Sequence, residues 1–309
     1  MILCLNLNAA IDKTIVVSSF AINKIHRPES VLALAGGKGC NVARALKTLK
    51  EMPVVTGWVG GGAGQFIENE LHQEGIESDF VHVDFESRTC TSILDRENQT
   101  MTEIYEKGES VPIEKVEQLQ NHIRKIIRSY NAVTLSGSLP PGVPSDFYAD
   151  VIKIAKQAEV LTFLDTSGEA LHKAVEAGPF FVKPNEAEAR ALLGVDPNES
   201  YDFFQGAGEI SRKYKVNVLL SLGADGAVAG NGQDAFIIKN PKVDAKSAVG
   251  SGDCTLAGLA YGILRGLSFE ESVICSVAAG TANTLMIGAG QFNLEDFERL
   301  RGQVQIIRK

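Results

Sequence analysis

The sequence has few of the features that mark secreted, metal-binding or membrane proteins. Its five cysteines are Cys4, Cys40, Cys90, Cys254 and Cys275. No two of them are spaced as zinc ligands or as a CxxC motif, and an odd number fits a disulfide framework poorly. The N-terminus also lacks the basic region and long apolar run of a signal peptide. We therefore expect reduced thiols and a cytoplasmic location.

Positive charge is scarce as well. The chain carries 30 Lys and Arg residues against 38 Asp and Glu residues, a net charge of −8. Nucleic-acid binding depends on clustered cations, so no nucleic-acid partner is expected. Residues 272–294 contain no charged side chain, but polar residues and glycines interrupt them. A membrane-spanning helix needs about 20 predominantly apolar residues, so we expect a buried helix followed by a loop, and no membrane partner.

Short apolar runs alternate with segments of helical periodicity. The runs that we interpret as buried strands are residues 2–7, 54–59, 133–135, 161–164, 180–182 and 216–220. The clearest helical face lies between residues 256 and 267, where apolar residues recur at spacings of three and four. This alternation predicts an α/β fold with a mostly parallel sheet that is covered on both faces. No linker divides the chain, so a single domain over residues 1–309 is expected.

Two regions interrupt this alternation. Residues 14–20 with 31–35, and residues 89–94 with 101–105, have strand-like character and no helical signal within each pair. We interpret them as a small antiparallel flap, covering about residues 13–35 and 87–106. Such a flap could act as a lid over a binding site. The alternative is that these segments are edge strands of the main sheet.

Polar or glycine-rich residues follow five of the predicted strands. The segments concerned are Asn8 to Asp12, residues 136–138, residues 165–168, residues 183–185 and residues 221–223. In an open parallel sheet, ligands bind outside the carboxyl ends of the strands. One polar segment after a strand means little, but five together predict a single polar rim along the carboxyl ends of the strands.

The most specific local feature is Gly250-Ser251-Gly252-Asp253, directly before the clearest amphipathic helix. Glycines allow backbone N–H groups to turn toward an anion, and a helix N-terminus adds partial positive charge. This suits a transferring phosphoryl group, with Asp253 accepting the proton of an attacking hydroxyl. The helix dipole should keep Asp253 ionised and make it a weak base. The alternative is that Asp253 only caps the helix.

A second glycine turn, at residues 36–39, opens another helix and has Asn41 in its first turn. Lys38 could contact a phosphate and Asn41 a sugar hydroxyl. The turn is not a Walker A loop, because Gly39 stands where that motif has Ser or Thr. The glycines of residues 60–64 lack the third glycine of a dinucleotide fingerprint, which argues against a nicotinamide dehydrogenase.

Two arginines in the flap are candidates for substrate binding. Arg27 and Arg88 could each hold a substrate phosphate, because guanidinium groups match phosphate geometry. Isolated surface arginines are common, so the alternative is that each is an ordinary surface residue.

Taken together, these segments resemble the ribokinase-like sugar kinases, in their phosphofructokinase B branch. Residues 36–46 and 249–253 are similar to the two signatures of that branch. Its other blocks correspond to residues 8–12, 136–142, 165–171, 182–185 and 221–226, in order over nearly the whole chain. Within the branch, the resemblance is to the 1-phosphofructokinase and tagatose-6-phosphate kinase members.

The resemblance implies roles for individual residues. Asp253 would be the catalytic base, and the amides of Gly250, Ser251 and Gly252 would form the anion hole. The sugar would contact Asp12, Gly36, Gly37, Lys38 and Asn41, and its phosphate would lie near Arg27, Arg88 and Ser138. ATP would contact Lys183, Asn185, Ser221, Leu222, Gly223, Ala224, Asp225, Gly226 and Gly252. Asn185 and Glu188 would be linked indirectly to Mg²⁺.

The implied fold is a three-layer αβα domain with a β lid, and the implied activity is ATP-dependent and uses Mg²⁺. The expected reaction converts fructose 1-phosphate to fructose 1,6-bisphosphate. Tagatose 6-phosphate is the alternative acceptor, because an epimer is discriminated by fine pocket geometry. A sugar-phosphate sensor without catalysis is a more distant alternative. A homodimer through the lid would suit its apolar Val16, Val17 and Phe20.

Overall fold

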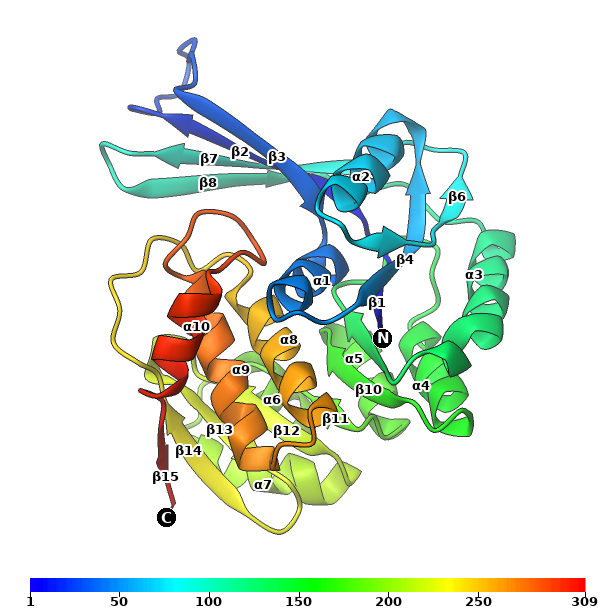
Figure 1. The fold of residues 1–309 in the computed structure, drawn as a ribbon, viewed down its shortest axis with the longest axis vertical. Coiled ribbons are helices and arrows are strands. Elements are labelled where there is room, and N and C mark those ends of the chain that lie inside the picture. Colours follow the sequence, from blue (N-terminus) through cyan, green and yellow to red (C-terminus); the bar gives the residue numbers. More distant parts are fainter. Residues whose placement is uncertain (309) are drawn as a thin grey trace.

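A mostly parallel sheet forms the main body of the protein in the computed structural model, which describes residues 1–308 (Figure 1). Its parallel strands are β1 (Ile2–Asn6), β4 (Pro53–Gly60), β5 (Glu77–Ser78), β6 (Val81–Val83), β9 (Ala132–Ser136), β10 (Leu161–Asp165), β11 (Phe181–Val182) and β12 (Asn217–Ser221). Three antiparallel strands extend one edge: β13 (Ala227–Gly230), β14 (Ala235–Lys239) and β15 (Gln305–Ile307). Every run predicted as a buried strand falls on one of the parallel strands, whereas β13 to β15 were not predicted.

The strand order in the described residues is β15-β14-β13-β12-β11-β10-β9-β1-β4-β5, with β6 also beside β4. The chain passes from β1 to β4 on one side and later to β9 on the other side. Both neighbours pair with β1 in parallel, Ile2 opposite Pro53 and opposite Ala132. The order therefore reverses at β1, and a reversal of this kind opens a crevice at the carboxyl ends of the strands.

Helices cover both faces of this sheet. One core cluster contains residues of α1 (Lys38–Thr48), α2 (Gly61–Gln73), α8 (Ser251–Leu264), α9 (Phe269–Asn283) and α10 (Leu294–Arg301). The other contains residues of α3 (Ile113–Ile126), α4 (Phe147–Gln157), α5 (Gly168–Glu176), α6 (Glu186–Leu193) and α7 (Phe203–Tyr214). Successive residues of β1 alternate between the two clusters, because side chains alternate across a strand. The three-layer prediction is confirmed.

The uncharged segment 272–294 folds as expected. Its first part belongs to α9, and a loop follows from residue 284 to α10. Across residues 1–308, none of the helices combines the length and the apolar character that crossing a bilayer requires.

A separate small sheet stands at the carboxyl end of the main sheet (Figure 1). It consists of β2 (Ala10–Val17), β3 (Ser30–Gly36), β7 (Arg88–Asp95) and β8 (Thr100–Tyr105), in the order β3-β2-β7-β8. The edge-strand alternative is therefore wrong. The expected antiparallel pairing is confirmed within each pair, β2 with β3 and β7 with β8. The two pairs are joined in parallel, however, because β2 and β7 run in the same direction, Ala10 opposite Arg88. Each of the two follows a strand of the main sheet, so both leave that sheet in the same direction.

Candidate active site

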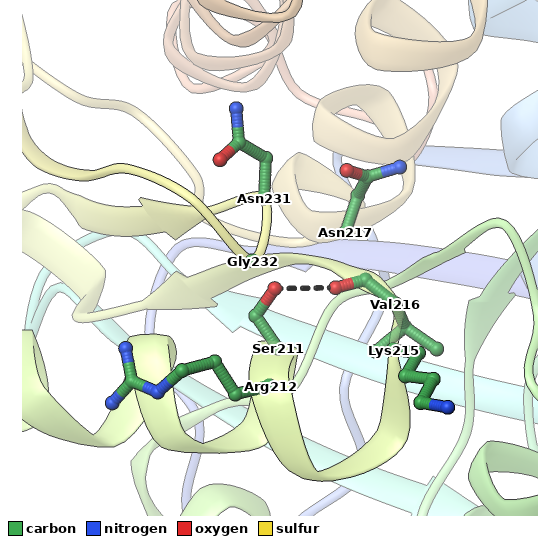
Figure 2. Close-up of a pocket in the computed structure, with 7 residues that line it drawn as sticks. All are labelled: Ser211, Arg212, Lys215, Val216, Asn217, Asn231 and Gly232. Atoms are coloured by element: carbon green, nitrogen blue, oxygen red, sulfur yellow. Dashed lines mark hydrogen bonds between the residues drawn. The ribbon is translucent and has the colours of Figure 1, made fainter.

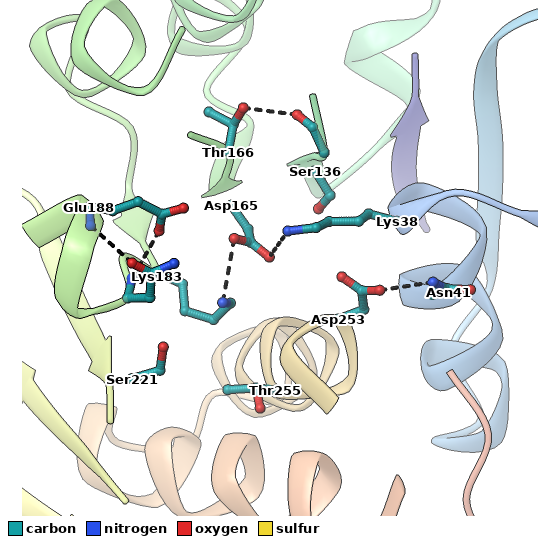
Figure 3. Close-up of polar contacts among 12 residues, drawn as sticks. Lys38, Asn41, Ser136, Asp165, Thr166, Lys183, Glu188, Ser221, Asp253 and Thr255 are labelled. Atoms are coloured by element: carbon teal, nitrogen blue, oxygen red, sulfur yellow. Dashed lines mark hydrogen bonds and ion pairs between the residues drawn. The ribbon is translucent and has the colours of Figure 1, made fainter. Parts of the chain in front are cut away.

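The predicted site residues lie mainly around the carboxyl ends of β1, β9, β10, β11 and β12, where α1 and α8 begin (Figure 3). A cavity of about 290 Å³ opens between the second sheet and the segment before α8. Asp12 and Leu34 line it from the sheet, and residues 246–249 and 287–289 line it from below. The polar rim predicted from the strand exits is thus present, and the second sheet stands over it.

The glycine turn before α8 needs its first glycine. Gly250 has a φ of 80°, in the left-handed region, and a Cβ there would lie 2.6 Å from the Gly290 nitrogen. The next residues form the first turn of α8, whose N–H groups have no acceptor within the helix. Of the predicted anion-hole amides, Ser251 N–H already donates to the Ala248 carbonyl (3.2 Å). The amides of Gly252 and Asp253 are therefore better suited to hold an anion.

Asp253 lies inside this first turn, three residues after the capping Gly250, so the alternative that it only caps the helix is wrong. Its side chain is buried, and Asn41 Nδ2 donates to its Oδ2 at 2.9 Å. Burial raises the pKa of Asp253 to about 6, and the positive charge of Lys38 opposes that rise. Burial therefore makes Asp253 a stronger base than the weak base expected from the helix dipole. Asp253 is mostly ionised at neutral pH and binds a proton well.

Asp165, at the end of β10, holds two lysines that come from opposite sides of the site. Its Oδ2 is 3.3 Å from Lys38 Nζ, and its Oδ1 is 3.4 Å from Lys183 Nζ. Only 3% of Asp165 is exposed. Lys183 also lies beside the α8 turn, because a Cβ on Gly252 would be 3.4 Å from its Nζ. Two cations thus stand on either side of the place where the α8 amides and Asp253 meet (Figure 3).

The glycine turn before α1 is packed by polar side chains. A Cβ on Gly36 would overlap the Asp12 carboxylate at 2.3 to 2.6 Å, and Gly37 N–H donates to Asp12 Oδ2 (3.4 Å). Burial raises the pKa of Asp12 despite that hydrogen bond. The buried Asn6 donates to the Gly36 carbonyl and accepts from Gly39 N–H. These contacts hold Asp12 beside the start of α1.

One of the two predicted phosphate-binding arginines lies at the rim. Arg88 begins β7, and its guanidinium donates to the Asn8 carbonyl (3.3 Å). Asn8 Nδ2 in turn lies 3.5 Å from Ser138 Oγ. These residues form a polar corner at the ends of β1 and β9. Arg27 is not part of it, because it is exposed in the connection between β2 and β3.

The residues predicted to bind nucleotide lie at the end of β12 and at the start of α6. Ser221 ends β12, and residues 222–226 form a short 3₁₀ turn and its flanks, with Asn240 Nδ2 donating to the Gly223 carbonyl (3.0 Å). Asn185 pairs with Ser221 as an isolated bridge. Asn185 and Glu188 make the reciprocal hydrogen bonds of a capping box at the start of α6. Their side chains therefore have a structural role that does not depend on a metal ion.

Comparison with known proteins decides the family. A model of the pfkB family of carbohydrate kinases matches residues 5–296. The chain belongs to the pfkB family of carbohydrate kinases. A tagatose-6-phosphate kinase of Staphylococcus epidermidis is 32% identical over 310 residues, which covers 99% of each chain.

Solved structures agree with this assignment to the pfkB kinases. Phosphofructokinase-2 of Escherichia coli in complex with fructose-6-phosphate has a TM-score of 0.88 and 25% identity, over 98% of each chain. A "possible 1-phosphofructokinase" of Thermotoga maritima has a TM-score of 0.91 and 26% identity, over 100% of this chain and 99% of that one. The fold is thus that of the ribokinase-like pfkB kinases, and the protein is an ATP-dependent sugar kinase.

Another hollow of this pfkB kinase lies away from the rim, between α7 and the β12 and β13 strands (Figure 2). Its polar side chains include Arg212, Lys215, Asn217 and Asn231. Figure 2 shows that these side chains point in different directions and do not converge on a common point. The hollow therefore offers no built binding site.

Three residues of the kinase's site were not assigned a role from the sequence. Asp165 entered as part of the polar segment after the strand at residues 161–164 and of a family block, but without a role of its own. Asn6 was counted within a buried strand, where a polar side chain could have drawn attention. Arg44 entered only as one residue of the signature at residues 36–46. The sequence around it does not show its hydrogen-bond partners, which include Glu74 and Ala289.

Proposed function

We propose that this kinase transfers the γ-phosphoryl group of ATP to the terminal primary hydroxyl of a ketohexose phosphate. Tagatose 6-phosphate is the first candidate acceptor, supported by the two tagatose-6-phosphate kinases that match the whole chain at 31% and 32% identity. Fructose 1-phosphate, the first choice from the sequence, is the second candidate, supported by the Thermotoga maritima structure. Each acceptor has a phosphate at one end and a primary hydroxyl at the other.

The observation that carries the proposal is the position of Asp253 at the start of α8, between Lys38 and Lys183. The acceptor hydroxyl gives its proton to Asp253 while its oxygen forms a bond to the γ-phosphorus. The bond from that phosphorus to the bridging oxygen breaks, and ADP leaves. The amides of the α8 turn and the two lysines stabilise the charge on the transferring group.

The sugar phosphate is proposed to lie across the start of α1. Asp12 would accept hydrogen bonds from the sugar hydroxyls, and Asn41 would donate to them. The glycine turn at Gly36 and Gly37 would allow the sugar to approach the backbone. Its phosphate would bind at the polar corner of Arg88 and Ser138. This orientation directs the free primary hydroxyl toward Asp253.

ATP is proposed to bind along residues 221–226, with Lys183 on its phosphates. Residues 1–308 contain no cluster of three or more His, Cys, Asp or Glu side chains that could hold a metal ion by themselves. This fits Mg²⁺, which keeps several waters and is bound mainly through substrate phosphates and one or two carboxylates. Glu188 has one carboxylate oxygen in the capping box, and its other oxygen could serve as a ligand, with Asn185 fixing the side chain. Mg²⁺ would neutralise charge on the phosphates during transfer.

A homodimer through the second sheet is also proposed. Val16 and Val17, named from the sequence, are buried within the chain and cannot form such an interface. Large apolar side chains are nevertheless exposed on the second sheet and its β2–β3 connection. They are Ile22, Ile25, Val31, Leu32, Met101, Ile104 and Tyr105. The buried free thiols support a reducing compartment, and we propose the cytoplasm.

A substrate panel tests the proposed function. Purified protein with Mg-ATP should release ADP in the presence of tagatose 6-phosphate or fructose 1-phosphate, and kcat/KM should rank the two. Fructose 6-phosphate and unphosphorylated ketohexoses serve as comparison acceptors. Binding of sugar phosphate and ATP without turnover of any acceptor would contradict the proposal and support a sensor.

A further inference from the structure

Arg44 is a buried cation that the proposed chemistry does not use. It lies in the middle of α1, three residues after Asn41, and 6% of it is exposed. A guanidinium has five N–H donors, and each of them has an acceptor here. The acceptors are Glu74 Oε2 (2.8 Å), Glu74 Oε1 (2.9 Å), the Ala35 carbonyl (2.9 Å), the Ala289 carbonyl (3.1 Å) and Asn41 Oδ1 (3.3 Å). A side chain held at every donor has a fixed orientation.

The contact with Arg44 determines which way the Asn41 amide faces. A guanidinium cannot accept a hydrogen bond, so Asn41 must present Oδ1 to it and direct Nδ2 elsewhere. Nδ2 donates to Asp253 Oδ2 at 2.9 Å. If the amide turned over, two oxygen acceptors would face each other across this buried contact. Arg44 therefore selects the amide orientation that binds the Asp253 carboxylate.

Arg44 also holds the segment that supports the glycine turn of α8. The Ala289 carbonyl accepts from Arg44, and a Cβ on Gly250 would lie 2.7 Å from Ala289 Cα. The neighbouring Gly290 packs against Asn41, because a Cβ there would be 2.5 Å from the Asn41 carbonyl oxygen. One guanidinium thus contacts both the side chain that binds Asp253 and the backbone that packs on the α8 turn.

We propose that Arg44 is a positioning residue for phosphoryl transfer, which fixes the Asn41 amide so that the Asp253 carboxylate keeps one orientation toward the acceptor hydroxyl. This inference rests on the proposed role of Asp253. Glu74, at the end of α2, balances the charge of Arg44. The simpler alternative is that Arg44 and Glu74 only join α1 to α2.

Stability cannot separate these two roles, because removing one partner of a buried ion pair is destabilising in either case. The protonation of Asp253 can separate them. The charged groups that face Asp253 are Lys38, Asp165 and Lys183, and the Asn41 hydrogen bond lowers the pKa of its carboxyl. Loss of that hydrogen bond should raise the pKa. A purely structural Arg44 would leave the pKa unchanged in molecules that remain folded.

The test compares Arg44→Gln/Glu74→Gln, which leaves no unpaired carboxylate, with Glu74→Gln alone. Arg265→Gln is a matched control, because Arg265 also pairs with a glutamate, Glu51 (2.7 Å), outside the site. The protonation midpoint of Asp253 is measured by carboxyl-carbon NMR on ligand-free protein and assigned with Asp253→Asn. The double variant should raise the midpoint by about one pH unit, the worth of roughly one hydrogen bond.

Steady-state kinetics supply the second readout. The double variant should lower kcat by about 100-fold, as misplacement of a reacting group does, while KM for ATP changes by less than about threefold. Glu74→Gln should lower the melting temperature but leave the Asp253 midpoint in place, and Arg265→Gln should change neither the midpoint nor kcat. If the double variant does not fold, Arg44→Lys is titrated instead, because one ammonium group cannot serve both Glu74 and Asn41.

An unchanged Asp253 midpoint in the variant that lacks the guanidinium overturns the inference, whatever happens to turnover. The NMR titration needs no substrate. Absence of wild-type turnover with every sugar phosphate would therefore defeat the proposed function, while the midpoint would still decide the role of Arg44.

Discussion

The starts of α1 and α8 share a design but differ in what they present to a ligand. Both helices begin after a glycine in the left-handed region, Gly37 with a φ of 97° and Gly250 with a φ of 80°. At α1, side chains of the protein already accept from the backbone, Asp12 from Gly37 N–H and Asn6 from Gly39 N–H. At α8, no side chain within residues 1–308 accepts from the N–H groups of the turn at residues 250–253 in this way, and Lys183 lies beside the turn.

A glycine turn at a helix N-terminus is therefore not by itself a binding site for anions. The α1 turn uses its amides internally and presents side chains, Lys38 and Asn41, which suits recognition of a polyhydroxylated sugar. The α8 turn presents backbone amides together with Lys183 and Asp253, which suits a transferring phosphoryl group. The predictions below test whether the α1 turn binds the sugar and the α8 turn binds the transferring phosphoryl group.

Among the tests of this comparison, the largest effect is expected from replacing the two lysines that contact Asp165, Lys38 and Lys183. Lys38→Met and Lys183→Met should each lower kcat/KM by about 100-fold or more, because each removes a charge that stabilises the transition state. In addition to the loss of kcat, Lys38→Met should raise KM for the sugar phosphate more than KM for ATP, and Lys183→Met should do the reverse. Initial rates with each substrate varied in turn measure this. Lys173→Met is the control, because Lys173 pairs with Glu169 on α5 and donates to the Ser145 hydroxyl, and neither residue is part of the proposed site.

Equal effects of both lysine substitutions on the two KM values would show that the turns do not divide sugar from nucleotide. Such a result would indicate that Lys38 and Lys183 belong to one phosphate site shared by the sugar phosphate and ATP.

The next effect concerns the backbone of the α8 turn. Gly250→Ala should lower the free energy of unfolding by about 3 kcal/mol or more, because a left-handed conformation and a collision with residues 289 and 290 both oppose a Cβ. Gly168→Ala is a matched control, since Gly168 has a φ of 63° but open space around its Cβ position. It should cost about 1 to 2 kcal/mol. Urea unfolding measures both, and equal losses would remove the collision from the account.

A smaller effect is the pH dependence of stability. Burial holds the pKa of Asp253 at about 6, above the ordinary value near 4 that it has in the unfolded chain. Its stabilising contribution is complete below about pH 4 and is lost as pH rises to about 6. Asp253→Asn should therefore be more stable than the wild type above pH 6, by up to about 2 to 3 kcal/mol, and this gain should shrink below it. Urea unfolding at pH 4 and pH 8 measures it, and a gain independent of pH would contradict the stated pKa.

A feature of the fold could be predicted from the sequence when the residues that form it lie close together in the chain. The buried strands, the helix after residue 250 and the separate second sheet were predictable, because periodicity and glycine turns are local signals. The parallel pairing of β2 with β7 was not, since their registers depend on where each leaves the main sheet.

The site divides in the same way. The glycine turns and Asp253 were visible as motifs, and the family resemblance supplied the other positions. The two lysine contacts of Asp165 and the contact of Arg44 with residue 289 join residues that are far apart in the chain. The raised pKa of Asp253 likewise comes from burial in the folded protein, which a helix-dipole argument on the sequence alone could not supply.

The most direct test of the role of Asp253 is the rate of a single phosphoryl transfer by Asp253→Asn at saturating Mg-ATP and acceptor. Asparagine keeps the shape of the side chain but cannot take a proton from the hydroxyl. The rate should fall about 1,000-fold, within the range of a lost general base, while the dissociation constant for ATP changes by less than about twofold. A variant that transfers the phosphoryl group at the wild-type rate would contradict the account.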